Sequence, residues 1–166
     1  MAAIVVTGFE EYLDLLDTTE RQARTMCGRA IHPGAKIVAD ECKKELEALR
    51  TDDDLFRISE KFGALRAGPT KRQKKALIES MGIAKMRRTG GGWDVKLGFD
   101  GYNDIVSDRW PKGQPNAMIA RSVNKGTSFM QRQPFMDHSV RISEKRCIEA
   151  IEDEFNKQLE KYWGRK

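Results

Sequence analysis

The sequence has few cysteines and histidines, and this scarcity narrows the chemistry open to it. Cys27, Cys42 and Cys147 include no Cys-x-x-Cys pair, and an odd number of cysteines argues against a complete disulfide framework. His32 and His138 lie far apart and have no ligand-like spacing to the cysteines. We therefore expect reduced structural thiols and no structural zinc site.

Long apolar runs are also lacking. No stretch approaches the roughly 20 apolar residues that a membrane-crossing helix needs. The first eight residues, Met1-Ala-Ala-Ile-Val-Val-Thr-Gly8, have no basic leader, and their apolar run is too short for a signal peptide. These observations predict a protein that folds in a cytosol without membrane contact.

Signatures of catalysis are missing as well. Asp52-Asp53-Asp54 lacks the alternating ligands and closing glutamate of a calcium loop. Thr89-Gly90-Gly91-Gly92 lacks the lysine and the following helix of a phosphate loop. The three cysteines fall on apolar helix faces, which is typical of unreactive thiols. We therefore expect no enzymatic activity, no catalytic residues, no cofactor and no metal site.

The composition suits one globular domain over residues 1–166. Hydrophobic residues make up 39% and charged residues 33%, as in a folded chain with a well-solvated surface. The formal net charge of +5 permits contact with an anionic partner. Such a charge describes nonspecific attraction and solubility, and it does not demand a nucleic-acid interface.

Apolar residues at seven-residue spacing predict a long N-terminal helix. Phe9, Leu16, Ala23, Ala30 and Ile37 fall on one helical face, and apolar residues continue on it to Leu49. Pro33 removes a backbone hydrogen bond and clashes with the preceding turn, at a cost of about 3 kcal/mol. Together with the flexible Gly34, it predicts a kink or a break that leaves two helices in similar phase.

The clearest strand pattern lies in the middle of the chain. Trp93, Val95, Leu97 and Phe99 alternate with polar or small residues, so one face of a strand is apolar. Residues 81–88 are the expected partner strand, and the glycines after Thr89 supply the positive φ angles that a hairpin turn requires.

The last third of the sequence predicts two more helices. Asn116 is expected to cap a short helix that Gly126 ends, and Asp137 or Ser139 to start the final helix. The expected apolar face of this final helix consists of Val140, Cys147, Ile148, Ile151, Phe155, Leu159 and Tyr162.

The resulting fold class is α+β. A small antiparallel sheet, with its central hairpin at about 81–100, would be packed by the long, kinked N-terminal helix and the C-terminal helix. Segments at about 50–70 and 101–116 are expected to be mobile. The first of them contains a possible short amphipathic piece around Leu55–Phe62.

Three stretches carry a resemblance to a known family. Residues 34–43 start with Gly-Ala and continue with the apolar pair Ile37-Val38, and residues 75–83 have a leucine followed by a serine-hydrophobic entry into the sheet. Residues 125–137 contain a Gly-Thr-Ser loop, then Pro-Phe and a terminal helix. In this order, with a hairpin between them, they resemble the minor tail-component or tail-completion family of long-tailed phages and prophages.

The resemblance implies a structural virion protein that acts in head–tail joining or tail completion and is assembled in the host cytoplasm. It implies a homo-oligomer, a ring where the capsid connector meets the tail. Its partners would be copies of itself, the head connector, and tail terminator or tail-tube proteins. It implies no catalytic residues.

Two groups of residues are candidates for this role. Gly126, Thr127, Ser128, Phe129 and Met130 form the expected subunit-contact loop, although Gly126 itself can be read as a simple helix stop. Pro134 and Phe135 are expected to act as a structural staple, in which proline fixes the entry to the last helix and the phenylalanine packs under it.

A basic cluster supports the main alternative function. Lys71, Arg72, Lys74 and Lys75 could touch DNA or an acidic ring surface, but an exposed helix face is the simpler interpretation and the one we expect. No aromatic residues are interleaved with them for base stacking. A basic nucleic-acid-binding module predicts salt-dependent, nonspecific duplex binding. A small nuclease is a further alternative, which no cluster of carboxylates or histidines supports.

Overall fold

The computed structural model describes residues 10–53, 65–89 and 92–163, which form four helices and two antiparallel strand pairs. The α+β class predicted from the sequence is confirmed. The elements in chain order are α1 (Glu10–Ala48), α2 (Lys71–Ser80), β1 (Met81–Ile83), β2 (Arg87–Thr89), β3 (Gly92–Asp94), β4 (Leu97–Phe99), α3 (Asn116–Lys125) and α4 (Phe135–Trp163).

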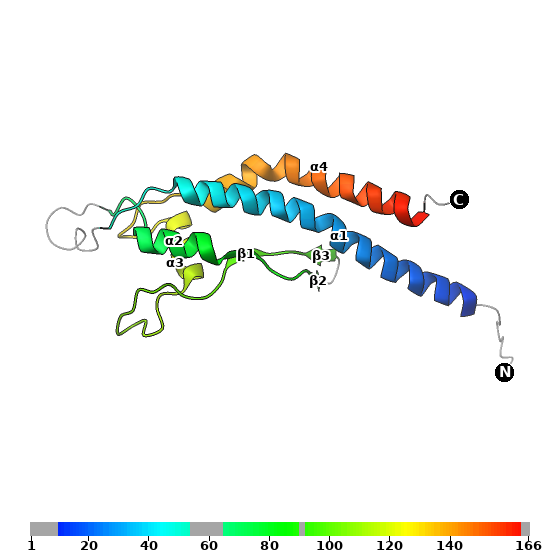
Figure 1. Cartoon of the computed structure of the whole chain (residues 1–166), viewed down its shortest axis with the longest axis horizontal. Coiled ribbons are helices and arrows are strands. Elements are labelled where there is room, and N and C mark those ends of the chain that lie inside the picture. The colour runs from blue at the N-terminus through cyan, green and yellow to red at the C-terminus, as the bar shows by residue number, and fades with distance from the viewer. Residues whose placement is uncertain (1–9, 54–64, 90–91, 164–166) are drawn as a thin grey trace, which may run out of the picture.

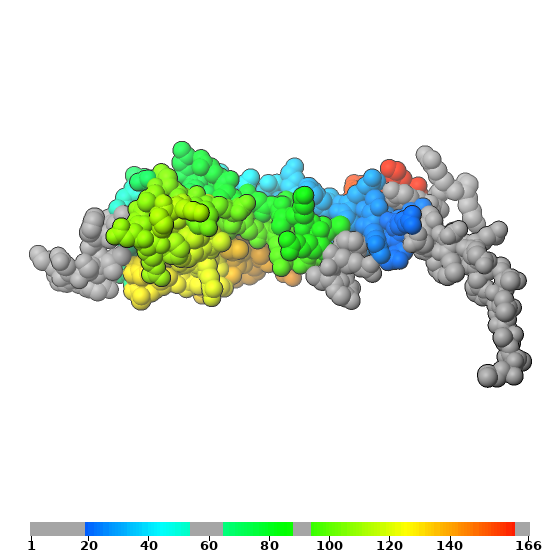
Figure 2. Space-filling view, turned by 90° about the horizontal axis from the view of Figure 1, so that it is seen from below, coloured from blue at the N-terminus to red at the C-terminus, as the bar shows by residue number. Residues whose placement is uncertain are grey.

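The molecule is elongated, and α1 runs along most of its length (Figure 1). Helix α4 lies antiparallel along one side of α1, and the strands lie along the other side (Figure 1). Helices α2 and α3 gather with the loops at the C-terminal end of α1, and we call this part the broad end. Figure 2 shows the broad end tapering towards the start of α1.

Helix α1 continues through Pro33 as one gently curved helix (Figure 1). The expected break into two helices is therefore wrong. Proline removes only the bond to the carbonyl of Arg29, whereas the helix is held by packing on two sides. Its buried positions include Met26, Ala30, Ala39 and Leu46, and such packing supplies most of the stability of a helix in a protein.

Two glycines let neighbouring elements approach α1 closely. A Cβ atom at Gly34 would lie 2.6 Å from Cγ1 of Ile151 and 3.0 Å from the carbonyl oxygen of Cys147, so α4 packs directly on the α1 backbone there. A Cβ atom at Gly28 would lie 2.7 Å from Cε of Met86, which belongs to the hairpin. These contacts place α1 between α4 and the hairpin.

The predicted hairpin is present, with a bulge that the sequence pattern did not predict. Met81 pairs with Phe99 and Ile83 with Leu97, whereas Arg87 pairs with Asp94 and Thr89 with Gly92. Residues 84–86 therefore face only residues 95–96, and one extra residue interrupts the ladder. Leu97 and Phe99 pack against the main core, as their alternation predicted.

The ends of α3 and α4 differ in detail from the prediction. Asn116 is the first residue of α3 and not its cap, because its side-chain amide donates to the carbonyl of Asp100 at 2.9 Å instead. Gly126 does end α3, with φ +75° and ψ 169°, a positive φ outside the left-handed helical region. Helix α4 starts at Phe135, before both predicted start residues.

The predicted apolar face of α4 is partly wrong. Val140, Ile148 and Phe155 are exposed, and the buried positions of the first turns are Phe135, Ser139 and Ser143. The two serine hydroxyls each donate to the carbonyl four residues earlier at 2.6 Å, so their burial leaves no polar group unsatisfied. These small side chains allow α4 to lie close to α1.

Hydrogen bonds hold the two segments predicted to be mobile at several points. Asp52 donates its N–H to the carbonyl of Pro69 at 2.9 Å and accepts from the N–H of Ala67 through Oδ2 at 3.1 Å. In the second segment, Oδ1 of the buried Asn103 accepts from the N–H groups of Ile105 and Gln114. The possible amphipathic piece around Leu55–Phe62 lies outside the described residues.

Candidate subunit-contact site

The expected contact loop forms a tight turn. Thr127 and Met130 exchange backbone hydrogen bonds of 3.0 and 3.4 Å, and Oγ1 of Thr127 accepts from the N–H of Phe129 at 3.3 Å. The side chain of Met130 is 3% exposed and belongs to the core, whereas that of Phe129 is 42% exposed. Met130 therefore anchors the turn and cannot contact a partner, while Ser128 and Phe129 face outwards.

A second segment of the chain holds this turn in place. The N–H of Arg66 donates to the carbonyl of Phe129 at 2.9 Å, and the N–H of Gln131 donates to the carbonyl of Arg66 at 2.8 Å. This parallel pairing of Arg66 with Met130 puts the preceding residues, Leu65 and Phe129, on neighbouring segments. Both side chains are exposed apolar groups, so two chain segments contribute to one apolar surface.

Gln133 joins three parts of the broad end. Its side-chain oxygen accepts from the N–H of Arg50 at 2.9 Å, and its side-chain nitrogen donates to the carbonyls of Arg50 and Ala67, each at 3.0 Å. Its own N–H donates to the carbonyl of Val123 at 2.9 Å. No pattern in the sequence points to Gln133, because a glutamine between a loop and a proline has no characteristic spacing.

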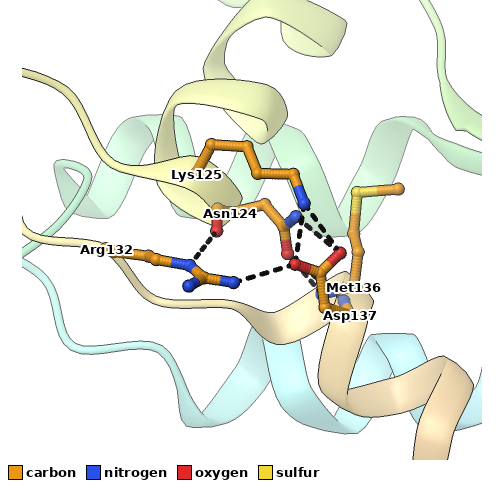
Figure 3. A network of polar contacts seen from close by, with 5 residues as sticks. All are labelled: Asn124, Lys125, Arg132, Met136 and Asp137. Atoms are coloured by element: carbon orange, nitrogen blue, oxygen red, sulfur yellow. Dashed lines mark hydrogen bonds and ion pairs between the residues drawn. The ribbon is translucent and has the colours of Figure 1, made fainter.

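Asn124 acts as the N-terminal cap of α4 although it lies at the end of α3 (Figure 3). Its Oδ1 accepts from the N–H groups of Met136 and Asp137 at 2.9 and 3.3 Å, and its Nδ2 donates to the carboxylate of Asp137 at 3.1 Å. The first N–H groups of a helix need such partners, and the usual cap is a residue next to them in sequence. Here the cap comes from another helix and joins the two.

Two cations share the carboxylate of Asp137 (Figure 3). Nζ of Lys125 lies 2.8 Å from Oδ2, and Nη2 of Arg132 lies 3.1 Å from the same oxygen. The hydrogen bond from Lys125 and, after it, the one from Asn124 lower the pKa of Asp137 from 3.8 to about 2. This network closes the loop from 126 to 134 at its base.

Pro134 and Phe135, the expected staple, stand at the junction of this loop with α4. The carbonyl of Pro134 accepts from the N–H of His138 at 2.9 Å, within the first turn of the helix. The ring of Phe135 is buried and meets the ring of Phe99 edge to face, with centroids 6.0 Å apart. The loop therefore runs between a capped helix end and an aromatic contact with the sheet.

The four residues of the basic cluster all lie on α2 and all have intramolecular partners. Lys71 pairs with Asp53 at 3.5 Å, Arg72 with Asp104 at 2.8 Å and Lys75 with Glu79 at 3.8 Å. Nζ of Lys74 donates to the carbonyls of Glu47 and Leu49 at 2.7 and 3.0 Å, where α1 ends. Lys74 thus satisfies carbonyls that the end of a helix leaves without partners.

Two of the three cysteines, Cys42 and Cys147, are weak nucleophiles because of burial. Burial raises the pKa of the Cys42 thiol to about 11 and also raises the pKa of Cys147. Among the residues described, no group of three or more His, Cys, Asp or Glu side chains is placed to hold a metal ion. Nor, over the same part of the chain, is any helix both long and apolar enough to span a membrane.

The site is therefore an anchored turn that presents an aromatic ring, held by a polar network and a core methionine. Comparison with known proteins adds no identification, since neither a family model, nor a curated protein, nor a solved structure matches this chain.

Proposed function

We propose that the protein is a structural component of a tailed bacteriophage or prophage particle. It acts in head–tail joining or tail completion, as a subunit of a ring. The proposal starts from the resemblance of residues 34–43, 75–83 and 125–137 to the tail-completion family. The structural observation that supports it best is the exposed Phe129 on a turn with a fixed backbone.

A fixed turn suits a contact between subunits. Immobilising a loop on binding costs conformational entropy, and a turn that is already held by Arg66 and Met130 avoids much of this cost. Aromatic side chains are enriched in the cores of protein interfaces. Further apolar side chains are exposed on the loops of the broad end, namely Leu65, Tyr102 and Val106.

The nucleic-acid-binding alternative gains no comparable support. A DNA site needs cations that are available to phosphates. Here nearby carboxylates partly neutralise the exposed Lys71, Arg72 and Lys75, and Lys74 donates to the end of α1. The basic cluster is better explained as an exposed face of α2 whose charges have partners within the chain.

The test is to delete the gene from the phage or prophage that carries it and to image the resulting particles. We expect full heads beside separate tails of normal length. Complementation with the unaltered gene should restore virions, whereas Phe129→Asp should not, although its circular dichroism and unfolding midpoint stay near those of the unaltered protein.

Ile142→Asp is the matched control, because Ile142 is exposed to a similar extent, 40% against 42%, but lies on α4 away from the turn. We expect this variant to restore virions. Infectious, intact particles from the deletion strain would overturn the proposal. Full complementation by Phe129→Asp would show that the turn is not a contact site.

A further inference from the structure

A groove lies on the broad end between β4, α3 and the start of α4. It encloses about 640 Å³. Its apolar lining includes Gly98, Phe99, Ala120 and Met136, and its charged edges include Arg121 and Lys125. Asn124, Lys125 and Asp137 of the polar network also line the groove, and Figure 3 shows Met136 beside the Lys125–Asp137 pair. The groove therefore offers an apolar lining with a polar edge.

On the strand side, the groove is lined by Phe99 and by the bare backbone of Gly98. Gly98 pairs with Gly82 across β1 and β4, and a Cβ atom on either would meet no other atom within 4 Å. Neither φ angle is positive, so the turn chemistry that usually selects glycine does not apply. Glycine inside a strand often marks a place where another chain approaches closely. Of the two, Gly98 lines the groove and leaves space there for an occupant.

The edge of the groove is positively charged. Arg121 forms no ion pair within the part of the chain that the structure describes. Lys125 is paired with Asp137 at the same edge, so Arg121 leaves this edge with one positive charge in excess. An occupant with carboxylates beside apolar side chains would complement this edge.

The start of α1 has that composition and lies at the other end of the molecule. Figure 1 shows the first turns of α1 extending past both α4 and the hairpin. Their sequence contains no basic residue before Arg21, and it combines acidic with apolar residues: Glu10, Glu11, Tyr12, Leu13, Asp14, Leu15, Leu16 and Asp17. Carboxylates in the first turn of a helix interact favourably with its dipole. Asp14 and Asp17 lie beyond that turn, so this effect does not explain them.

We propose that the groove binds the first turns of α1 from a second copy of this chain. The contact joins two different surfaces, the start of α1 on one subunit and the groove on the next. Such a heterologous contact generates a closed ring when the rotation between subunits closes, and a filament when it does not. The proposal rests on the ring assembly proposed above and assigns its contact surfaces.

The test is sedimentation velocity of the full-length protein over a concentration series. We expect the unaltered chain to associate with a dissociation constant of about 1 mM or lower. Gly98→Tyr, which fills the groove where nothing stands within 4 Å, and Arg121→Glu should each weaken association by about tenfold or more. Arg141→Glu, the same charge change on an exposed site of α4, should leave it unchanged.

Charge reversal on the other surface makes the test specific. Asp14→Arg with Asp17→Arg should weaken association, and mixing this variant with Arg121→Glu should restore mixed complexes. A chain that stays monomeric throughout the series would overturn the inference, as would equal association of the unaltered protein, Gly98→Tyr and Arg121→Glu. If rings form and the groove variants leave their formation unchanged, the groove is not the contact surface. The proposed role in the virion is then still tested separately by the gene deletion.

Discussion

At the scale of single residues, buried polar groups decide how the segments of the broad end are joined. Asn124 is only 4% exposed, yet its amide bonds two N–H groups of α4 and the Asp137 carboxylate. A buried amide with partners stabilises one arrangement, because any other would leave it unsatisfied at a cost of about 1–3 kcal/mol. Asn124 thus fixes the angle between the end of α3 and the start of α4.

The low pKa of Asp137 gives this network a measurable pH dependence. The unfolded chain binds a proton at this carboxyl near pH 3.8, and the folded chain only near pH 2. The contribution of Asp137 to stability is therefore present above pH 3.8 and is lost as the pH falls towards 2. Urea unfolding across this window should show a free energy of unfolding that falls more steeply in the unaltered protein than in Asp137→Asn.

Lys125→Met provides the comparison for this measurement. It keeps the carboxyl but removes the largest cause of the shift, so its slope should lie between the other two. Identical slopes for the unaltered protein and Asp137→Asn would show that the network does not hold the carboxylate in solution.

Buried polar residues with distant partners are those that the sequence could not reveal. Asn124 and Gln133 act through partners that lie up to 83 positions away in the chain, and no local spacing encodes such contacts. The proposed contact loop is predicted by its resemblance and its turn residues. That Met130 is buried while Phe129 is exposed depends on the pairing with Arg66, and this pairing is defined only by the fold.

At the scale of elements, close approach to α1 depends on glycine in different ways at two positions. At Gly34 a methyl group would press on Ile151 and on a backbone oxygen of α4, neither of which can move freely. At Gly28 it would meet only the flexible end of Met86. Alanine in place of glycine inside a helix stabilises the helix by about 1 kcal/mol, whereas overpacking destabilises the fold by about 1–3 kcal/mol.

We therefore predict opposite effects of the same substitution at the two glycines. Gly28→Ala should leave the free energy of unfolding unchanged or raise it by up to about 1 kcal/mol. Gly34→Ala should lower it by about 1 kcal/mol or more, because the close contact outweighs the gain in helix propensity. Urea denaturation measures both, and the loss at Gly34 should shrink in an Ile151→Ala background. Equal stability gains at both positions would contradict the packing described for α4.

The long elements were predictable because they depend on local periodicity. The alternation from Trp93 to Phe99 predicted the hairpin, and the apolar stripe predicted α1. The pattern failed where tertiary packing decides, as at Pro33 inside α1 and at the buried serines of α4. One local signal was missed: Thr70 and Gln73 form a reciprocal capping box at the start of α2, with the spacing typical of helix starts.

At the scale of the whole molecule, α1 sets the shape. Its 39 residues span about 58 Å at 1.5 Å per residue, and the other described elements lie along it (Figure 1). A compact chain of 166 residues has a radius of gyration of about 15 Å. Small-angle X-ray scattering of the dilute monomer should give a clearly larger value, and a value near 15 Å would mean that α1 does not extend in solution.

The contacts of Asp52 with Ala67 and Pro69 have a practical consequence. They hold Asp52 next to Ala67 and Pro69, so the positions of these residues depend little on the length of the chain between them. Doubling the length of a connection that is closed in this way costs only about 0.6 kcal/mol in chain entropy. An epitope inserted between Asp52 and Ala67 should therefore be tolerated and would mark the broad end of the molecule in a micrograph.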